Sequence, residues 1–393
     1  MGHFSCSIAR VKWVTFQFPL TIPRNQGVSE DYALVVIEAI KRLHERHAWQ
    51  TTDGCRVSVG LIRVANIGPC MQLAGKLEAI GTGENGPSVY VCPYHARDLM
   101  IRRVFKEYWL DKLLKRKAGP MNTAIERFLR EELNVKPGSE LALIVVATPV
   151  EEVGRDHDFD WAIIEPSSLH SIIQTAGRVN RHRRLAVEEA NIILLNRNIR
   201  ASRGEPLVFT RPGLEFRNEE KGQTTHPCHD METLLDAKAG EQPPLSTRLV
   251  FGDEPPPLAR YDQEAIRRRL APLGAVLGLS HPAWASQWFY EAYPLREREK
   301  RDAYRIMDAD GKPALERFEN GRWIQKKEDA RTIICDKPPG CAWLCPSLEE
   351  LGAWIEEKDL NLTSWEAFRF DLHFRSNADT SEFLITWKGI ECQ

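Results

Sequence analysis

The stretch Thr148-Pro-Val-Glu-Glu-Val-Gly-Arg-Asp-His-Asp-Phe-Asp160 follows an apolar run at residues 141–147 and precedes a second block, Gln174-Thr-Ala-Gly-Arg-Val-Asn-Arg181. An apolar run of this length, bounded by polar residues, predicts a buried strand. A loop with Thr, Gly and Asp after such a strand can meet phosphate and ribose oxygens. We expect the second block to lie on a short helix, so that Arg178 and Arg181 share one face and reach a single phosphate group.

Strand-like and helix-like patterns alternate through the first half of the chain. We expect strands at residues 11–18, 56–62, 88–92, 141–147, 161–164 and 190–195, and helices at 30–47, 70–80, 99–114, 121–133 and 169–179. In the first helix, Leu34, Ile37, Ile40 and Leu43 are expected to form the apolar face. This alternation predicts an α/β fold whose parallel sheet has helices on both faces. By itself it indicates architecture and not function.

The residue composition of the chain changes after residue 197, where apolar runs become rare. We expect residues 1–50 to lead into a main domain at 51–197, followed by a linker or long loop at 198–260 with a short strand at 206–210. Residues 261–393 are expected to form a smaller mixed α+β domain. It holds seven of the eleven tryptophans, among them Trp284, Trp288 and Trp365, with hairpin turns at 308–311 and 319–321 and a helix at 348–358.

The composition is that of an ordinary globular chain of 393 residues. The formal net charge is −2, so any surface for nucleic acid must be local and not a property of the whole chain. We find no apolar run long enough to span a bilayer and no signal-peptide pattern at the start. The nine cysteines have no regular spacing, which is typical of a reducing compartment. We therefore expect a cytoplasmic protein.

Four blocks occur in the order of the motifs of superfamily 2 helicases, and the wording of residues 146–184 is most similar to the helicase–nuclease of type I-F CRISPR systems. The blocks are 58–67, 91–97, 148–160 and 174–181. The resemblance implies a second RecA-like motor domain followed by the family's C-terminal domain. It also implies a part in ATP-dependent translocation on single-stranded DNA during antiviral defence. A solvated basic helix face could explain the last block alone, but not four blocks in order.

The resemblance also implies roles for individual residues. Arg178 and Arg181 would be arginine fingers that stabilise charge on the transferring phosphoryl group, and Gln174 would orient phosphate or water. Gly154, Asp156 and Gly177 would lie beside the nucleotide. The residues implied at the DNA are Thr148, Arg63, Asn66, His95 and Arg97.

Several parts of such a motor are not found in this sequence. We find no Gly-x-x-x-x-Gly-Lys-Ser/Thr phosphate loop, no acidic box for Mg²⁺ and no cluster of nuclease ligands. We therefore expect ATP and Mg²⁺ to bind only together with a chain that supplies the first RecA-like and nuclease domains. The other expected partners are single-stranded DNA and the guide-RNA interference complex. Two alternatives stay open: a non-catalytic binder that competes with or regulates these partners, and an inert remnant.

Three further patterns invite a metal site that we do not expect. His157-Asp158 lies inside the loop block and lacks the other ligands of a metal nuclease, so we expect it to shape the loop. The cysteines and histidines at 226–229 and 335–345 lack paired Cys-x-x-Cys spacing, which argues against zinc. The acidic turn at 308–311 is too short for a calcium loop.

Overall fold

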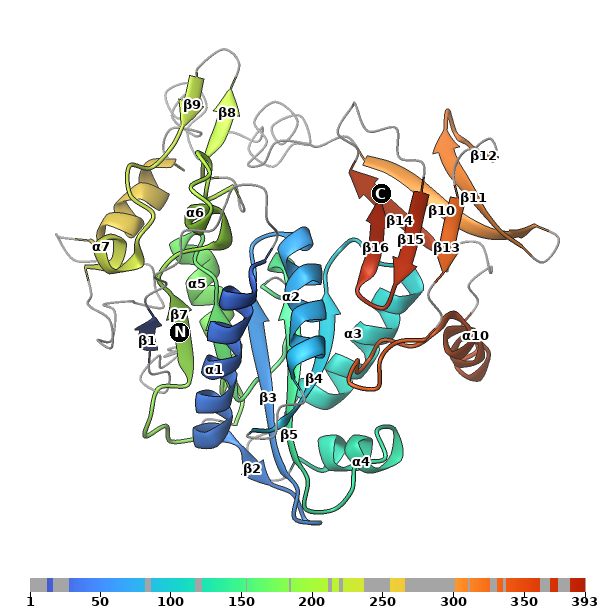
Figure 1. The fold of residues 1–393 in the computed structure, drawn as a ribbon, viewed down its shortest axis with the longest axis horizontal. Coiled ribbons are helices and arrows are strands. Elements are labelled where there is room, and N and C mark those ends of the chain that lie inside the picture. Colours follow the sequence, from blue (N-terminus) through green and yellow to red (C-terminus); the bar gives the residue numbers. More distant parts are fainter. Residues whose placement is uncertain are drawn as a thin grey trace, which may run out of the picture.

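The computed structural model describes most of the chain (Figure 1). It leaves out residues 1–12, 17–27, 82–85, 117–121, 153, 184, 211–213, 219–221, 237–254, 266–300, 310–311, 326–330, 335–336, 361–367, 374–381 and 393. Trp284, Trp288, Trp365 and Cys335 of the sequence predictions lie outside the described residues. Within the described part, no helix has both the length and the apolar character that a membrane span requires.

A parallel sheet forms the centre of the molecule, as predicted. Its strands run in the order β1 (Trp13–Phe16), β7 (Ile192–Leu195), β6 (Trp161–Ile164), β3 (Arg56–Arg63), β5 (Glu140–Ala147) and β4 (Ser88–Tyr94). All five neighbouring pairs in this order are parallel, and the short β2 (Trp49–Gln50) adds antiparallel to β3. Strands buried on both faces explain the continuous apolar runs in the sequence.

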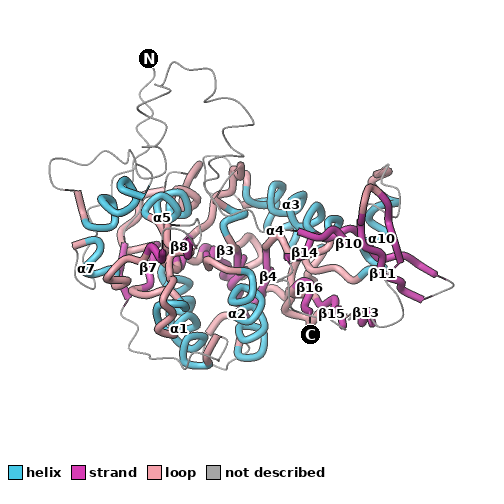
Figure 2. Tube along the Cα trace, turned by 90° about the horizontal axis from the view of Figure 1, so that it is seen from above, coloured by secondary structure: helices cyan, strands magenta, loops and turns pink. Residues whose placement is uncertain are grey.

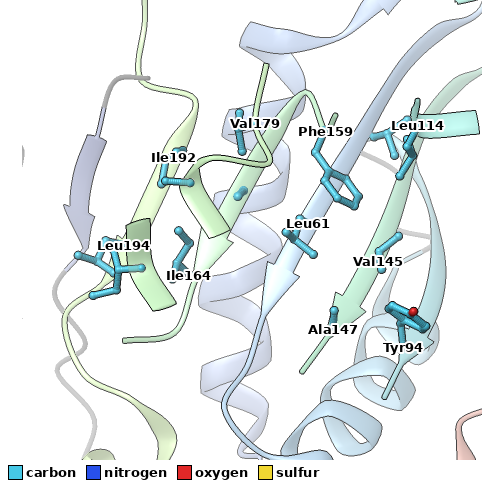
Figure 3. Close-up of a cluster of buried hydrophobic side chains, with 14 of the residues drawn as sticks. Leu61, Tyr94, Leu114, Val145, Ala147, Phe159, Ile164, Val179, Ile192 and Leu194 are labelled. Atoms are coloured by element: carbon cyan, nitrogen blue, oxygen red, sulfur yellow. The ribbon is translucent and has the colours of Figure 1, made fainter. Parts of the chain in front are cut away.

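Helices cover both faces of this sheet (Figure 2). Helices α1 (Glu30–His47) and α2 (Ile67–Ile80) lie on one face, and α3 (Met100–Leu114), α4 (Thr123–Glu131) and α5 (Leu169–Ala176) on the other. Successive side chains of β3 point to opposite faces of the sheet, so Leu61 packs in one hydrophobic core and Ile62 in the other. Figure 3 shows Leu61 with Val145 and Phe159 in the first core. The α/β layering predicted from the sequence is therefore confirmed.

Gly60 shows why one strand position admits no side chain. An added Cβ would lie 2.1 Å from the ring of Trp161 on the neighbouring strand. The indole N–H of Trp161 donates to the Ser58 hydroxyl at 3.0 Å, which fixes the ring across β3. Glycine at position 60 thus lets a large aromatic residue lie flat against the sheet.

Three predictions about elements were wrong in detail. Leu34 is 52% exposed, because the buried face of α1 is formed by Tyr32, Val36, Ile40 and Leu43. Helix α5 ends at Ala176 and not at residue 179, so the motif arginines lie beyond it. Residues 206–210 are described and form no strand. Val208 and Phe209 instead give their N–H groups to the Glu215 carboxylate and bury their side chains.

The described part of the expected linker belongs to the packed body. It contains α6 (Ile199–Ser202), the hairpin of β8 (Phe216–Asn218) and β9 (Gly222–Thr224), and α7 (Met231–Leu235). Met231, Leu234 and Leu235 are buried in the same core as Leu61. The described residues of this segment therefore pack against the main sheet domain, and the predicted domain limits stay a prediction. The isolated apolar residues of this otherwise polar stretch are the sequence signal of its burial.

The C-terminal region has the predicted mixed α+β character. Strands β10 (Arg301–Ala309), β11 (Lys312–Glu319), β12 (Arg322–Gln325) and β14 (Arg369–His373) form an antiparallel sheet, and β13 (Arg331–Ile334), β15 (Glu382–Thr386) and β16 (Gly389–Cys392) a second, mixed one. Strand β10 pairs antiparallel with β11, although residues 310–311 of the first predicted turn lie outside the described residues. The second predicted turn joins β11 to β12, and Asn320 and Gly321 have the positive φ angles, 48° and 80°, that a tight hairpin requires. Helix α10 (Leu348–Glu357) begins with a capping box of Ser347 and Glu350.

This region is joined to the parallel sheet at the β4 edge. Val91 donates its N–H to Cys341 O at 2.8 Å and accepts from Trp343 N at 3.2 Å. The indole N–H of Trp343 reaches Ile144 O at 3.0 Å, and its ring is buried. Residues 341–343 therefore cover the outer edge of the sheet, as an exposed edge strand requires.

Candidate functional site

The predicted DNA residues follow the carboxyl ends of neighbouring strands. Arg63 pairs with Ala147 and Ile164 in the strand register, and Tyr94 pairs with Ala147. Asn66, His95 and Thr148 each lie just beyond this common edge. Ligand sites of parallel sheets lie at this edge. The fold thus brings these segments together, but it does not leave all of their side chains accessible.

Arg63 is a buried structural residue in this structure. Its side chain is fully buried, its Nε lies 2.7 Å from Glu152 Oε1, and its NH1 donates to Glu165 O at 3.0 Å. A buried charge must be paired, and here the Glu152 carboxylate and the Glu165 carbonyl are the partners of Nε and NH1. Arg63 is therefore not accessible to DNA in this structure, and its contact with DNA stays a prediction.

His95 is also buried, beneath the hairpin of β15 and β16. Its Nδ1 accepts from Arg97 N at 3.1 Å, so its Nε2 carries the proton and donates to Lys388 O at 2.6 Å. Burial lowers the pKa of His95 to about 4, against the opposing effect of Asp98. A neutral imidazole covered by the C-terminal region offers nothing to a DNA phosphate. His95 is therefore not accessible to DNA in this structure, and its contact with DNA also stays a prediction.

The other predicted DNA residues lie in different environments. Thr148 is 4% exposed, gives its N–H to Tyr94 O at 3.1 Å and begins the 3₁₀ turn η2 (Pro149–Glu151). Its hydroxyl would need a local opening to reach DNA. Asn66 precedes α2 and is partly exposed, as is Arg97, whose carbonyl accepts from Ile390 N. DNA contacts by Asn66 and Arg97 stay predictions.

The motif loop after η2 is held at several points. We call residues 152–158 the 152–158 loop. Glu152 accepts from Arg63 and from the Ser171 hydroxyl at 2.8 Å. His157 lies between Glu151 at 2.7 Å and Asp111 at 3.1 Å. The loop-shaping role expected for His157 fits these contacts.

Two residues of this loop face solvent. Gly154 has φ +72°, a conformation that favours glycine, and no described atom lies within 4 Å of where its Cβ would be. The Asp156 side chain is 54% exposed. Both were predicted beside a nucleotide, and both are accessible to one.

The second motif block meets this loop. Arg181 Nε lies 2.9 Å from Asp156 Oδ1, and His182 Nε2 lies 3.0 Å from the same oxygen. Gly177 ends α5 as its cap, and its carbonyl accepts from Arg181 NH1 at 3.3 Å. Gln174 lies on the last turn of α5 and is partly exposed. The structure therefore brings together the predicted nucleotide residues.

Arg178 differs from Arg181. It is 6% exposed, and its guanidinium donates to Glu152 O at 2.8 Å and to Arg155 O. Burial, and next the charge of Arg181, lower its pKa from the usual value. The expected shared helix face was wrong. After Gly177 the chain bonds to residue 159 instead of continuing the helix: Phe159 N donates to Arg178 O at 2.8 Å.

Comparison with known proteins identifies the family. The sequence model of the CRISPR-associated nuclease/helicase Cas3 C-terminal family matches residues 56–184, from β3 to the end of the second motif block. The chain is 35% identical over 354 residues, 85% of its length, to the "CRISPR-associated nuclease/helicase Cas3 subtype I-F/YPEST" of Pseudomonas aeruginosa (strain UCBPP-PA14). This chain corresponds to the C-terminal part of such a Cas3 protein.

Further relatives agree on the part of Cas3 to which the chain corresponds. The subtype I-F/YPEST Cas3 of Pectobacterium atrosepticum is 31% identical over 389 residues, 92% of this chain. The chain spans 32% and 34% of these two relatives, about a third of their length, and corresponds to their C-terminal part. A solved structure titled "Crystal structure of T. fusca Cas3-ATP" aligns with 78% of this chain and 32% of its own, at 15% identity and a TM-score of 0.43.

A buried charge cluster that was not predicted from the sequence lies next to the two motif blocks. Asp160 accepts from Arg116 at 2.6 Å, from Arg183 at 2.5 Å and from Val59 N at 2.7 Å. Burial alone would raise the pKa of Asp160, but the two arginines outweigh it and lower it to about 2. The signal in the sequence was an aspartate directly before an apolar strand, with Arg183 in the basic run.

The candidate metal patterns have other partners here. His229 Nε2 lies 2.7 Å from Glu215 Oε1, and His226 Nδ1 faces Cys228 O at 2.6 Å. Within the described residues, no group of three or more His, Cys, Asp and Glu side chains has the arrangement of a metal site. These histidines instead fasten the segment around Glu215.

Proposed function

We propose that this chain supplies the second motor domain and the C-terminal domain of a type I-F Cas3 helicase–nuclease, and that the 152–158 loop with Arg181 forms its half of an ATP site. The observation that carries this proposal is the pairing of Arg181 with Asp156 at 2.9 Å on an accessible surface. An arginine opposite a transferring phosphoryl group stabilises the developing charge. The work expected of this half-site is translocation on single-stranded DNA.

The residues present fit half of a nucleotide site. Arg181 offers a partly exposed cation, Asp156 an acceptor for a ribose hydroxyl, and Gly154 an approach free of any side chain. A phosphate cradle and Mg²⁺ ligands would come from the first motor domain, which carries these elements in superfamily 2 enzymes. We infer that ATP and Mg²⁺ bind at the junction of the two domains, and only weakly to this chain alone.

The partners follow from the same proposal. Besides the first motor and nuclease domains, we expect single-stranded DNA at the carboxyl edge of the sheet, near Asn66 and Arg97, and the guide-RNA interference complex. We expect the protein in the cytoplasm, where such complexes meet foreign DNA. A non-catalytic role would need the same partners without hydrolysis.

Reconstitution tests the proposal against that alternative. The chain is purified from its host together with the polypeptide segment that carries the phosphate loop, and ATP hydrolysis is measured with and without single-stranded DNA. We expect DNA-stimulated hydrolysis that Arg181→Gln reduces on the order of 10³-fold, as loss of an arginine finger does. Binding to the interference complex without any hydrolysis, unchanged by Arg181→Gln, would instead establish a competitor.

A further inference from the structure

The two arginines of the second motif block lie in unlike environments, although they are three residues apart. Arg178 is 6% exposed, whereas the Arg181 side chain is 39% exposed. Between them Asn180 has φ 49°, in the left-handed region, and its N–H donates to Phe159 O at 2.9 Å. This turn separates the directions in which the two side chains leave the backbone.

Arg178 is bonded to the main chain of the 152–158 loop. Its two terminal nitrogens donate to Glu152 O and Arg155 O, the carbonyls on either side of Gly154. Its own carbonyl accepts from Phe159 N, just after the loop. The planar fork of a guanidinium suits two acceptors at once. Arg178 thereby ties both ends of the loop to the segment after α5.

Arg181 is held only by groups at the surface. Its contacts are with the exposed Asp156 carboxylate at 2.9 Å and with Gly177 O at 3.3 Å. Arg183 is buried and paired with Asp158 and Asp160. Among residues 178–183, all of which are described, Arg181 is therefore the arginine whose guanidinium faces solvent.

We propose that the two arginines have different tasks: Arg178 is a positioning residue that fastens the 152–158 loop, and Arg181 alone of the pair leaves its carboxylate partner to meet the phosphoryl group. This inference rests on the proposed function. Moving Arg178 toward a phosphate would leave the Glu152 carbonyl, on a buried residue, without its donor, which is costly. Moving Arg181 only exchanges one accessible anion for another.

Hydrogen–deuterium exchange and kinetics together test this division. Exchange of the amides of residues 154–158 is measured on the 393-residue chain, which needs no nucleotide, for Arg178→Lys and Arg181→Lys. Steady-state ATP hydrolysis is measured for the same variants in the natural assembly that contains the phosphate loop. Arg127→Gln is the control, because its side chain on α4 is 71% exposed and pairs only within that helix.

The two variants are expected to differ in both loop exchange and ATP hydrolysis. Arg178→Lys should accelerate loop exchange roughly tenfold or more, because an ammonium cannot hold both carbonyls. It should raise KM for ATP more than it lowers kcat. Arg181→Lys should leave loop exchange unchanged and lower kcat on the order of 10³-fold.

One result would contradict the positioning role of Arg178, and another would contradict the proposed nucleotide half-site. If Arg178→Lys leaves loop exchange at the wild-type rate while kcat collapses as in Arg181→Lys, the positioning role of Arg178 is wrong. If the unaltered assembly hydrolyses no ATP, or Arg181→Lys keeps full kcat, the proposed nucleotide half-site is wrong. The exchange measurement still decides the role of Arg178 in that case.

Discussion

Arg63 Nε lies 2.7 Å from Glu152 Oε1, and both side chains are buried. The pair joins the end of β3 to the 152–158 loop. The second oxygen of Glu152 accepts from the Ser171 hydroxyl at 2.8 Å, which adds α5 to the same network. A single carboxylate thus connects the strand edge where DNA is expected with the helix that leads to Arg181.

The Arg63–Glu152 pair should matter more to stability than a surface ion pair. We expect Arg63→Met to lower the free energy of unfolding by about 3–5 kcal/mol, because it leaves a buried carboxylate unpaired. The double variant Arg63→Met/Glu152→Leu should lose less, since no charge is left without a partner. Urea unfolding of the three proteins measures this. Arg63→Met with unaltered stability but weaker DNA binding would restore the original DNA assignment of Arg63.

The lowered pKa of Asp160 predicts how the stability of the fold depends on pH. Its pKa of about 2 in the folded protein lies below its ordinary value of 3.8, so the carboxylate stabilises the fold above pH 3.8 and loses that effect as the pH falls toward 2. Asp160→Asn, which leaves Arg116 and Arg183 without this partner, should therefore destabilise strongly near pH 6. The difference from wild type should shrink as unfolding is measured from pH 4 down to pH 2. A difference that does not change with pH would show that the carboxylate charge is not what matters.

Trp343 should hold the C-terminal region on the β4 edge. Trp343→Ala is expected to cost about 3–5 kcal/mol, as for other large aromatic residues removed from a core. Trp343→Phe keeps most of the ring and loses only the bond to Ile144 O, so its cost should be smaller. Chemical unfolding gives both values, and proteolysis near residue 341 reports whether the segment has come away. Equal costs for the two variants would mean that the hydrogen bond, not the ring, holds the edge.

The sequence was sufficient for the architecture and for the local chemistry of the loop. Continuous apolar runs such as 141–147 predicted buried parallel strands, and Asn320-Gly321 predicted a hairpin, because both depend on nearest neighbours. The motif order predicted that Asp156 and Arg181 belong to one nucleotide site, whereas their direct pairing was not predicted. These features need no knowledge of distant contacts.

The accessibility of individual side chains could not be predicted in the same way. Arg63 and His95 looked like surface residues because their burial depends on partners 89 and 293 positions away, Glu152 and Lys388. The burial of Arg178 likewise depends on the carbonyls of Glu152 and Arg155, which lie 26 and 23 positions away. A sequence motif predicts which residue types lie together at a site, whereas their burial depends on which other segments pack over them.

Gly389 supplies the most direct test of the C-terminal hairpin as a cover over His95. Its φ is +132°, and an added Cβ would lie 2.5 Å from both Arg97 O and the His95 ring. Gly389→Ala should therefore push the hairpin away and break the bonds from Ile390 N to Arg97 O and from His95 to Lys388 O. We expect a lower melting temperature and faster amide exchange at residues 389–392.

Gly352→Ala is the matched control for that variant. Gly352 lies within α10, and no described atom comes within 4 Å of where its Cβ would be, so alanine should stabilise the helix by about 0.5–1 kcal/mol. The two substitutions add the same methyl group to the same region with opposite expected signs. If Gly389→Ala is as stable as Gly352→Ala and its hairpin exchanges no faster, the hairpin does not cover His95 in solution. His95 would then be free to contact DNA as first predicted, and the carboxyl edge of the sheet would be wider than this structure shows.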